Sequence, residues 1–240
     1  MELAALIDGN RITDLRTAAT AVVAVDALSP ARPLRVGVIG SSSLARNTLQ
    51  ALAAVGEVAA ARVFSPSPDN RQRFADDFRA SHGFDISAVD SPQAAVSGAD
   101  VVLCAARSRD ESSVFLGEWL QPGMVVVSVG STLPEQREVD VDAMARATLI
   151  VADMSEEIVH DTGDAIAAAK AGVDVAGKTV DLADVISGRV VGRRSAADVI
   201  FYKSVGTALQ DVVTAEMLLR TALATKRYAP MSERVMTITR

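Results

Sequence analysis

The 240-residue chain contains few aromatic side chains, one cysteine and two histidines. Aromatic residues make up 4% of it, so its core has to be built from alanine, valine, leucine and isoleucine. The single Cys104 excludes a disulfide within the chain, and the apolar run around it is typical of a buried thiol. Neither His82 nor His160 has a second histidine or cysteine at metal-ligand spacing, so we expect no metal site.

Long apolar runs and clusters of basic residues are also missing. No stretch reaches membrane-spanning length, and the first residues lack the basic start and apolar core of a secretory signal. The net charge of -6 comes from both signs scattered along the chain, which argues against a nucleic-acid partner. We therefore expect a cytoplasmic protein with neither a membrane nor a nucleic-acid partner.

Strands and helices are predicted to alternate from residue 34 to residue 152. The apolar runs at 34–39, 100–105 and 124–129 are typical of strands buried on both faces. The alternation predicts an α/β fold with a doubly wound parallel sheet of Rossmann type. Beyond residue 153 the pattern is mainly helical. It contains a helix at 155–171 that is interrupted near Gly163, a short strand at 199–202 and a long helix at 207–228.

The first strand leads into a turn, GSSSLA, that is close to the G-x-G-x-x-G/A motif of dinucleotide-binding proteins. Gly40 can make the sharp turn, but Ser42 stands where a second glycine would let the backbone approach a pyrophosphate. The hydroxyls of Ser41, Ser42 and Ser43 and the following helix N-terminus offer donors to an anion in compensation. The alternative is a purely structural strand–turn–helix in which a serine is the N-cap.

The end of the second predicted strand bears on the choice of cofactor. An acidic residue there would bind the ribose hydroxyls of NAD, but this chain has Ser65 and Ser67, with Arg71 as the nearest basic residue. Both hydroxyls can bind a 2′-phosphate, which favours NADP slightly over NAD. The alternative is a Ser-Pro loop that caps the next helix.

Several segments besides this turn occur in a characteristic order. They are RTAA at 16–19, GAD at 98–100, LQPG at 120–123, VGSTLP at 129–134, REVD at 137–140 and FYKSVGTA at 201–208. Their order and spacing resemble the ornithine cyclodeaminase/mu-crystallin family over nearly the whole chain. The resemblance implies a Rossmann domain, placed at 30–200, and a reduced dimerisation and substrate domain from both chain ends, 1–29 plus 201–240. It also implies NAD(P)(H) and an amino- or imino-acid substrate.

The resemblance implies site residues position by position. With Ser67 added from the argument above, the positions expected at the cofactor are Arg16, Gly40, Ser41, Ser42, Ser43, Leu44, Ser65, Ser67, Ala106, Val129, Gly130, Ser131 and Ser204. Those expected at the substrate are Arg16, Thr132 and Val205. A guanidinium suits this role because it can clamp a carboxylate or phosphate at two points. The alternative for Arg16 is an ion pair with Asp14 or another acid.

Departures from the family pattern narrow the expected chemistry. Thr132 stands where cyclodeaminases carry an aspartate, and a hydroxyl is no useful base at neutral pH. Leu44 stands where the family often has a polar residue, and Gln136 stands where it often has a lysine. No lysine precedes Lys170, and we expect the family's N-terminal substrate segment to be absent. We therefore favour imine reduction over ornithine cyclodeamination and assign no catalytic residue.

Two other hypotheses stay open. The chain can be a catalytically silent relative that works as a binding or scaffold protein, or a separate polypeptide can supply the missing segment. The long helix after Ser204 carries apolar surface, so we also expect a homodimer or a larger homo-oligomer.

Overall fold

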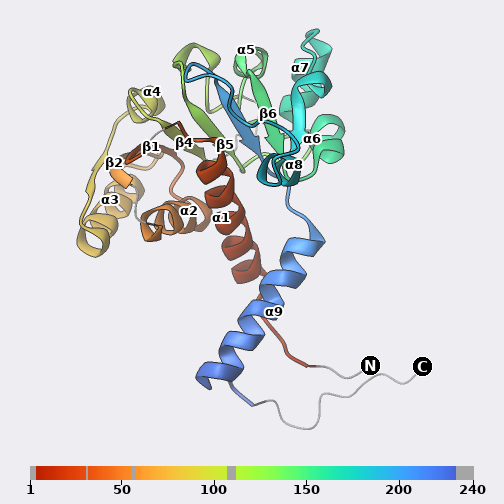
Figure 1. The fold of residues 1–240 in the computed structure, drawn as a ribbon. Helices are drawn as coiled ribbons and strands as arrows, with labels where there is room; N and C mark the ends of the chain where they lie inside the picture. The colour runs from red at the N-terminus through yellow and green to blue at the C-terminus, as the bar shows by residue number, and fades with distance from the viewer. Residues whose placement is uncertain (1–3, 31, 56–57, 107–111, 231–240) are drawn as a thin grey trace.

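The protein is described from a computed structural model that covers residues 4–30, 32–55, 58–106 and 112–230. Its strands are β1 Leu34–Ile39, β2 Val58–Phe64, β3 Asp85–Ala88, β4 Val101–Cys104, β5 Val125–Ser128, β6 Leu149–Ala152, β7 Thr179–Asp181 and β8 Ile200–Lys203. Within the described residues they form one parallel sheet in the order β3-β2-β1-β4-β5-β8-β6-β7 (Figure 1).

Helices cover both faces of the sheet. They are α1 Gly9–Leu28, α2 Ser43–Ala54, α3 Pro68–His82, α4 Pro92–Val96, α5 Val141–Arg146, α6 Ser155–Asp161, α7 Gly163–Lys170, α8 Leu182–Ile186 and α9 Ala208–Thr225. One core cluster joins the sheet to α1, α2, α3 and α8, and the other joins it to α4, α5 and α7. The fold is therefore the predicted doubly wound α/β architecture.

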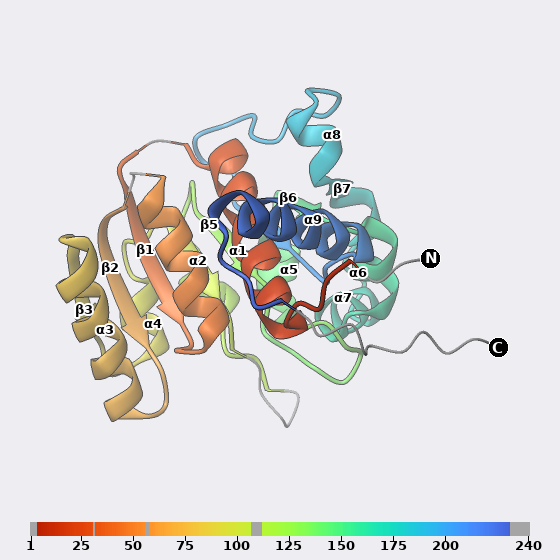
Figure 2. The ribbon, with the colours of Figure 1, turned by 90° about the horizontal axis from the view of Figure 1, so that it is seen from below.

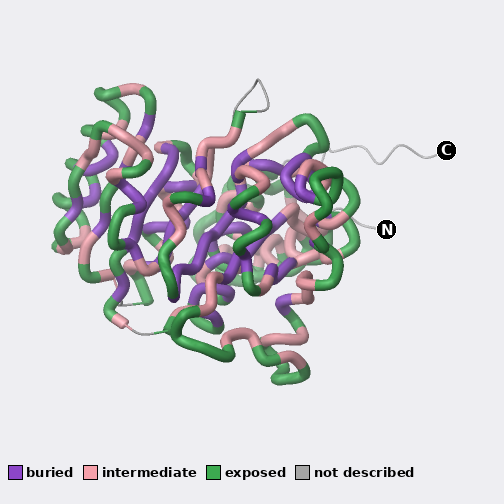
Figure 3. The backbone as a smooth tube through the Cα atoms, turned by 90° about the horizontal axis from the view of Figure 1, so that it is seen from above, coloured by how far each residue is buried: buried purple, intermediate pink, exposed green. Residues whose placement is uncertain are grey.

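The strands are buried because their side chains meet helices on both sides. β1, β4, β5 and β8 consist almost wholly of buried residues, and Figure 3 shows the buried backbone concentrated in the sheet. This is why these strands appear in the sequence as continuous apolar runs and not as alternating patterns. The predicted strand at 34–39 has the bounds of β1.

The chain changes direction along the sheet after β3. β1, β2 and β3 follow one another towards one edge, and β4 then returns to the other side of β1. In open α/β sheets, ligands bind outside the carboxyl ends of the strands at such a switch point. The order of the strands therefore places a candidate crevice between the ends of β1 and β4.

One predicted boundary differs from the structure, one predicted helix break is confirmed, and one strand was not predicted. The helix expected to reach residue 228 ends at Thr225, because Lys226 adopts a left-handed conformation with φ 56°. The interruption near Gly163 separates α6 from α7, and a Cβ at Gly163 would collide with the carbonyl of Gln136. β7 escaped prediction because its three residues include a single apolar one.

The proposed division into two domains stays a prediction. β8 lies between β5 and β6, so the sheet continues past the boundary expected at residue 200. α1 packs against α2, β5 and β8. Residues 1–3 and 231–240 of the predicted second domain lie outside the described residues.

α9 projects from the body and lies across α1 (Figures 1 and 2). None of its residues is buried, although it is described in full. Its exposed large apolar side chains are Leu209, Val212, Val213, Met217 and Leu223. No helix among the described residues is long and apolar enough to span a membrane.

Candidate functional site

Five adjacent strands carry predicted site residues directly beyond their carboxyl ends. In sheet order these strands are β2, β1, β4, β5 and β8. The residues that follow them are Ser65, Gly40 to Ser43, Ala106, Val129 to Ser131, and Ser204 with Val205. Because the strands are parallel, these positions share one edge of the sheet. The fold thus gathers residues that lie up to 165 positions apart in the sequence.

The turn after β1 requires glycine at its first position only. Gly40 has φ +110°, and a Cβ there would lie 2.7 Å from the carbonyl oxygen of Ala105. Ser42 has φ -68° and ψ 170°, an ordinary extended conformation, and its hydroxyl accepts a hydrogen bond from the amide of Ala45. Ser42 is therefore the N-cap of α2, as the structural alternative predicted. The N-terminus of α2 still faces this turn, where free N–H groups favour an anion.

A cavity of about 460 Å³ opens beside this turn. Gly40, Ser41 and Ser42 line it from β1, Ser65 from β2 and Ala106 from β4. The rest of its wall comes from Ile39, Phe64 and Ala105 at the strand ends, from Pro66 and Pro92, and from residues between 113 and 119. Five of the predicted cofactor positions therefore line a single hollow at the switch point.

The end of β2 carries a small network. Ser41 donates to the hydroxyl of Ser65 across 3.0 Å, and Arg71 donates to the carbonyl oxygen of Ser65 across 3.0 Å. Arg71 also pairs with the exposed Asp90 across 2.5 Å. The Ser67 hydroxyl accepts from the amide of Asn70 and caps α3, which agrees with the structural alternative for that residue.

Eight of the thirteen predicted cofactor positions do not line the cavity: Arg16, Ser43, Leu44, Ser67, Val129, Gly130, Ser131 and Ser204. The hydroxyl of Ser43 donates to Asp14 on α1 across 3.3 Å, and Leu44 packs against the core beneath α2. Val129 belongs to the same core cluster. The side chain of Ser43 thus bonds to α1, and those of Leu44 and Val129 pack in the core.

Asp153 holds the turn after β8. Its carboxylate accepts hydrogen bonds from the Ser204 hydroxyl at 2.6 Å and from the amides of Val205 at 3.1 Å and Gly206 at 2.9 Å. The N-cap of α6 is the next residue, Met154, and it has no side-chain cap bond. Within the described residues, the hydrogen bonds that the Asp153 carboxylate accepts all come from the turn after β8.

The side chain of Arg16, on α1, reaches the start of α9. Its Nε is 3.2 Å from Asp211 and its Nη1 is 3.3 Å from the Gln210 amide oxygen. The guanidinium packs against Gly206, where a Cβ would collide with it. The structure therefore shows an ion pair, with Asp211 as the acid and not Asp14. The same packing brings Arg16 to the turn that carries Ser204 and Val205.

A fully buried group of charges lies beneath the turns after β4, β5 and β8. Lys203 donates to Asp164 across 2.5 Å and also to the Ser128 hydroxyl and the Ser131 carbonyl. Asp164 in turn accepts from the amides of Glu138 and Val139. Lys203 lies in the FYKSVGTA segment, where a lysine at the end of a strand gives no sign of burial from the sequence alone.

Glu138 is the second carboxyl group of this cluster. Burial away from water raises its pKa from 4.5 to about 8, although Lys203 and the hydrogen bond from Ser128 lower it. The same burial raises the pKa of the neighbouring Cys104 thiol, with Glu138 and Asp164 adding to the rise. Glu138 lies in the REVD segment, and only the fold shows that its side chain is buried.

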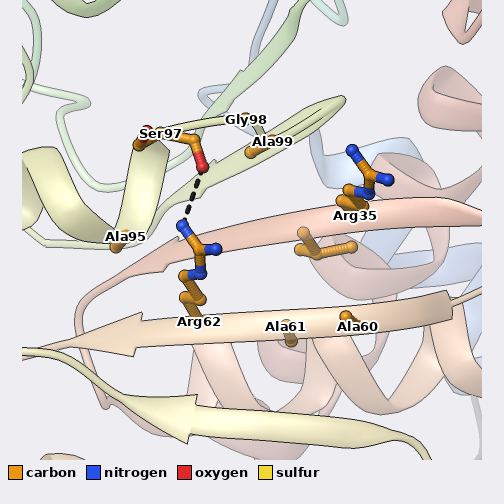
Figure 4. A pocket seen from close by; sticks show the side chains of 9 residues that line it. Arg35, Ala60, Ala61, Arg62, Ala95, Ser97, Gly98 and Ala99 are labelled. Carbon is orange, nitrogen blue, oxygen red and sulfur yellow. Dashed lines mark hydrogen bonds between the residues drawn. The ribbon is translucent and has the colours of Figure 1, made fainter.

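A second, smaller hollow of about 180 Å³ lies at the opposite edge of the sheet (Figure 4). Arg35 and Arg62 line it, and Arg62 donates to the carbonyl of Ser97 across 2.9 Å at the end of α4. This hollow is distant from the predicted site. Among the described residues, no group of three or more His, Cys, Asp or Glu side chains is placed to hold a metal ion.

The residues at the carboxyl edge fit a dinucleotide. A bare Gly40 lets a ligand approach the backbone, the N-terminus of α2 faces the same turn, and hydroxyls line the cavity. The sheet order and this turn define a Rossmann-type dinucleotide-binding fold. The chain belongs to the ornithine cyclodeaminase/mu-crystallin family, whose model matches residues 2–226.

Individual relatives agree with this assignment. The solved Delta(1)-pyrroline-2-carboxylate reductase of Thermococcus litoralis, in complex with NADH and L-proline, is 29% identical with a TM-score of 0.87. That match covers 93% of this chain and 68% of the other. The enzyme of the same name from Bacillus cereus is 28% identical over 91% of this chain and 67% of its own length. The ketimine reductase mu-crystallin of Mus musculus is 29% identical over 90% and 64%.

The chain spans about two thirds of the length of the curated relatives it matches. The shared part includes the whole parallel sheet and both flanking helices, α1 and α9. The comparisons therefore establish the family and the fold.

Replacing Gly40 with alanine tests the turn. Gly40→Ala adds a Cβ against the Ala105 carbonyl at a positive φ, so we expect it to lower the free energy of unfolding by about 2–4 kcal/mol. Gly83→Ala is the matched control, because Gly83 also has a positive φ but has open space around it. Its expected cost is about 1 kcal/mol. Urea denaturation measures both, and equal losses would contradict the close approach at Gly40.

The raised pKa of Glu138 predicts a pH-dependent stability. Between the ordinary value of 4.5 and about 8, the folded protein binds one proton more than the unfolded chain. The free energy of unfolding therefore falls as pH rises through this window, by up to about 1.4 kcal/mol per unit. Glu138→Gln has no titrating group at this position. The difference in free energy of unfolding between wild type and variant should therefore shift in favour of the variant from pH 5 to pH 8 and then level off. A shift in favour of wild type over that range would contradict the prediction.

Proposed function

We propose that the chain is an NAD(P)(H)-dependent oxidoreductase that reduces the imine bond of a small imino acid. The observation that supports the proposal is the row of five adjacent strand ends, which carries most of the positions predicted for the cofactor, five of them around one cavity. A dinucleotide is long enough to need such a row, with its pyrophosphate at the switch point between β1 and β4.

The relatives support the direction of this chemistry. Two of them are named as reductases of an imine, Delta(1)-pyrroline-2-carboxylate reductase and ketimine reductase, and the solved one holds NADH with L-proline. A cofactor bound here would supply the hydride to the imine carbon. Because the cofactor carries the difficult step, the protein has to bind and orient the substrate and keep water out.

The residues near the end of β8 suit this limited task. Arg16 is positioned to bind a substrate carboxylate, in exchange for its contact with Gln210. Val205 offers an apolar contact on the turn held by Asp153. Thr132, on the loop after β5, cannot act as a base. Imine reduction does not need one there, since solvent or the substrate's own ammonium can supply the proton.

The end of β2 favours NADP over NAD. A carboxylate at position 65 would repel a 2′-phosphate, but this position holds a serine whose neighbour Arg71 donates to its carbonyl. Arg71 is mostly buried and is already paired with the exposed Asp90, so a 2′-phosphate would replace or share an existing partner. This arrangement supports a modest preference.

Fluorescence titration with NADPH and NADH tests the binding and the preference together. We expect both to bind below millimolar concentration, with NADPH the tighter. Ser65→Asp should shift the ratio of the two dissociation constants towards NADH by about tenfold, because its carboxylate repels the 2′-phosphate. Because both dissociation constants are measured on the same variant, general damage to the fold affects both and cancels in their ratio. Failure of both cofactors to bind at millimolar concentration would overturn the proposal and favour a catalytically silent binding protein.

We further propose that a second copy of the chain covers α9. Its exposed apolar side chains stand on a helix with no buried residue, and its few charges include the internal pair of Arg220 with Glu216. A surface that is self-complementary in charge and rich in aliphatic side chains suits a symmetric contact between two copies.

Light scattering measures this association. We expect a homodimer or larger assembly at micromolar concentration, and we expect Met217→Glu to shift it towards the monomer by placing a charge in the apolar face. Met217→Leu, which keeps the same position apolar, serves as the control for the substitution itself. A monodisperse wild-type monomer would contradict the proposal.

A further inference from the structure

Glu138 connects two turns at the carboxyl edge through its side chain. Oε1 accepts a hydrogen bond from the amide of Ala106, 3.1 Å away, and Oε2 accepts from the amide of Gly130 at 3.0 Å. Ala106 follows β4 and lines the cavity, whereas Gly130 follows β5. One carboxyl group therefore spans the ends of two neighbouring strands.

The backbone of Glu138 reaches a third wall of the cavity. Its carbonyl oxygen accepts from the amides of Val114 at 3.0 Å and Phe115 at 2.9 Å. Val114 itself lines the cavity. The position of Glu138 thus fixes Ala106, Gly130 and Val114 relative to one another.

Close packing leaves this carboxyl group little freedom. A Cβ at Gly130 would collide with Oε1 of Glu138 and lie 2.6 Å from the carbonyl oxygen of Ala106. The hydroxyl of Ser128 donates to Oε2 across 2.7 Å. Ser128 also accepts from Lys203, whose ammonium is held by Asp164. The side chain of Glu138 is therefore locked from the sheet side as well as from the turns.

We propose that Glu138 is a positioning residue for the cofactor: its carboxyl group sets the separation of the Ala106 and Gly130 turns and so the affinity of the cavity for a dinucleotide. The inference rests on the proposed function. It adds a residue that contacts no ligand and acts through the backbone of two others. It also assigns a role to the buried charges, which the proposed chemistry does not use.

The charged and titratable groups around Glu138 come from three elements. Lys203 faces it from β8, Asp164 from α7 and Cys104 from β4. Charge-assisted hydrogen bonds are stronger than neutral ones, so the carboxylate holds both amides more firmly than the protonated acid does. The positioning effect should therefore strengthen as pH rises through about 8, the pKa of Glu138.

The test compares wild type with Glu138→Gln and with the control Glu157→Gln, an exposed glutamate on α6. The carboxamide keeps the shape but presents an N–H group to one of the two backbone donors. Amide hydrogen exchange of Ala106 and Gly130 is measured without cofactor, and the dissociation constant for NADPH is measured by fluorescence from pH 6 to pH 9.

We expect Glu138→Gln to exchange at least one of the two amides about tenfold faster and to bind NADPH about tenfold more weakly. Its deficit relative to wild type should grow through about pH 8, which a merely structural defect would not produce. Glu157→Gln should change neither quantity. Should Glu138→Gln fail to fold, Ser128→Ala removes one partner of the same carboxyl group and should act in the same direction.

Two failures are distinguishable. A wild-type chain that binds no dinucleotide overturns the proposed function, and the inference falls with it. Wild-type binding together with faster exchange but unchanged affinity in Glu138→Gln overturns the inference alone, as does a deficit that is flat with pH.

Discussion

The buried ion pair between Lys203 and Asp164 is the contact on which the carboxyl edge of this sheet depends. Lys203 ends β8, in the middle of the sheet, and Asp164 begins the second half of the broken helix that follows β6. Burying both charges costs hydration free energy, and removal of one partner from such a pair typically costs about 3–5 kcal/mol. The pair is satisfied because Asp164 also accepts two amides and Lys203 also reaches Ser128 and Ser131.

This contact organises the turns around it. Through Ser128 it reaches Glu138, and through Glu138 it reaches the turns after β4 and β5. Asp153, directly after the neighbouring strand β6, likewise holds the turn after β8 by accepting its hydrogen bonds. The site is thus built largely from backbone turns, and buried carboxyl groups keep them in place. That construction suits a protein whose cofactor performs the difficult chemistry.

Much of the fold could be predicted from the sequence because buried parallel strands appear as unbroken apolar runs. β1 and the turn at Gly40 were predicted in place, and so was the switch from alternating elements to a mainly helical region. β7 was missed because it is short and mostly polar. The site positions could be gathered from a family resemblance, which the family model and the relatives confirm. Their grouping into a cavity could not be predicted, since it depends on which strands become neighbours.

The roles of the acidic residues needed the structure. Glu138, Asp153 and Asp164 look like ordinary surface acids in the sequence, and only long-range pairing shows which are buried and which amides they accept. The partner of Arg16 could not be predicted from the sequence either, because Asp211 lies 195 positions away.

The central claim is that the carboxyl edge holds a nicotinamide dinucleotide. A crystal structure with NADPH tests it most directly. We predict a dinucleotide that runs from Ser65 across Gly40 and Ala106 towards Gly130. NADPH bound elsewhere, or crystals grown at millimolar NADPH without it, would contradict the account.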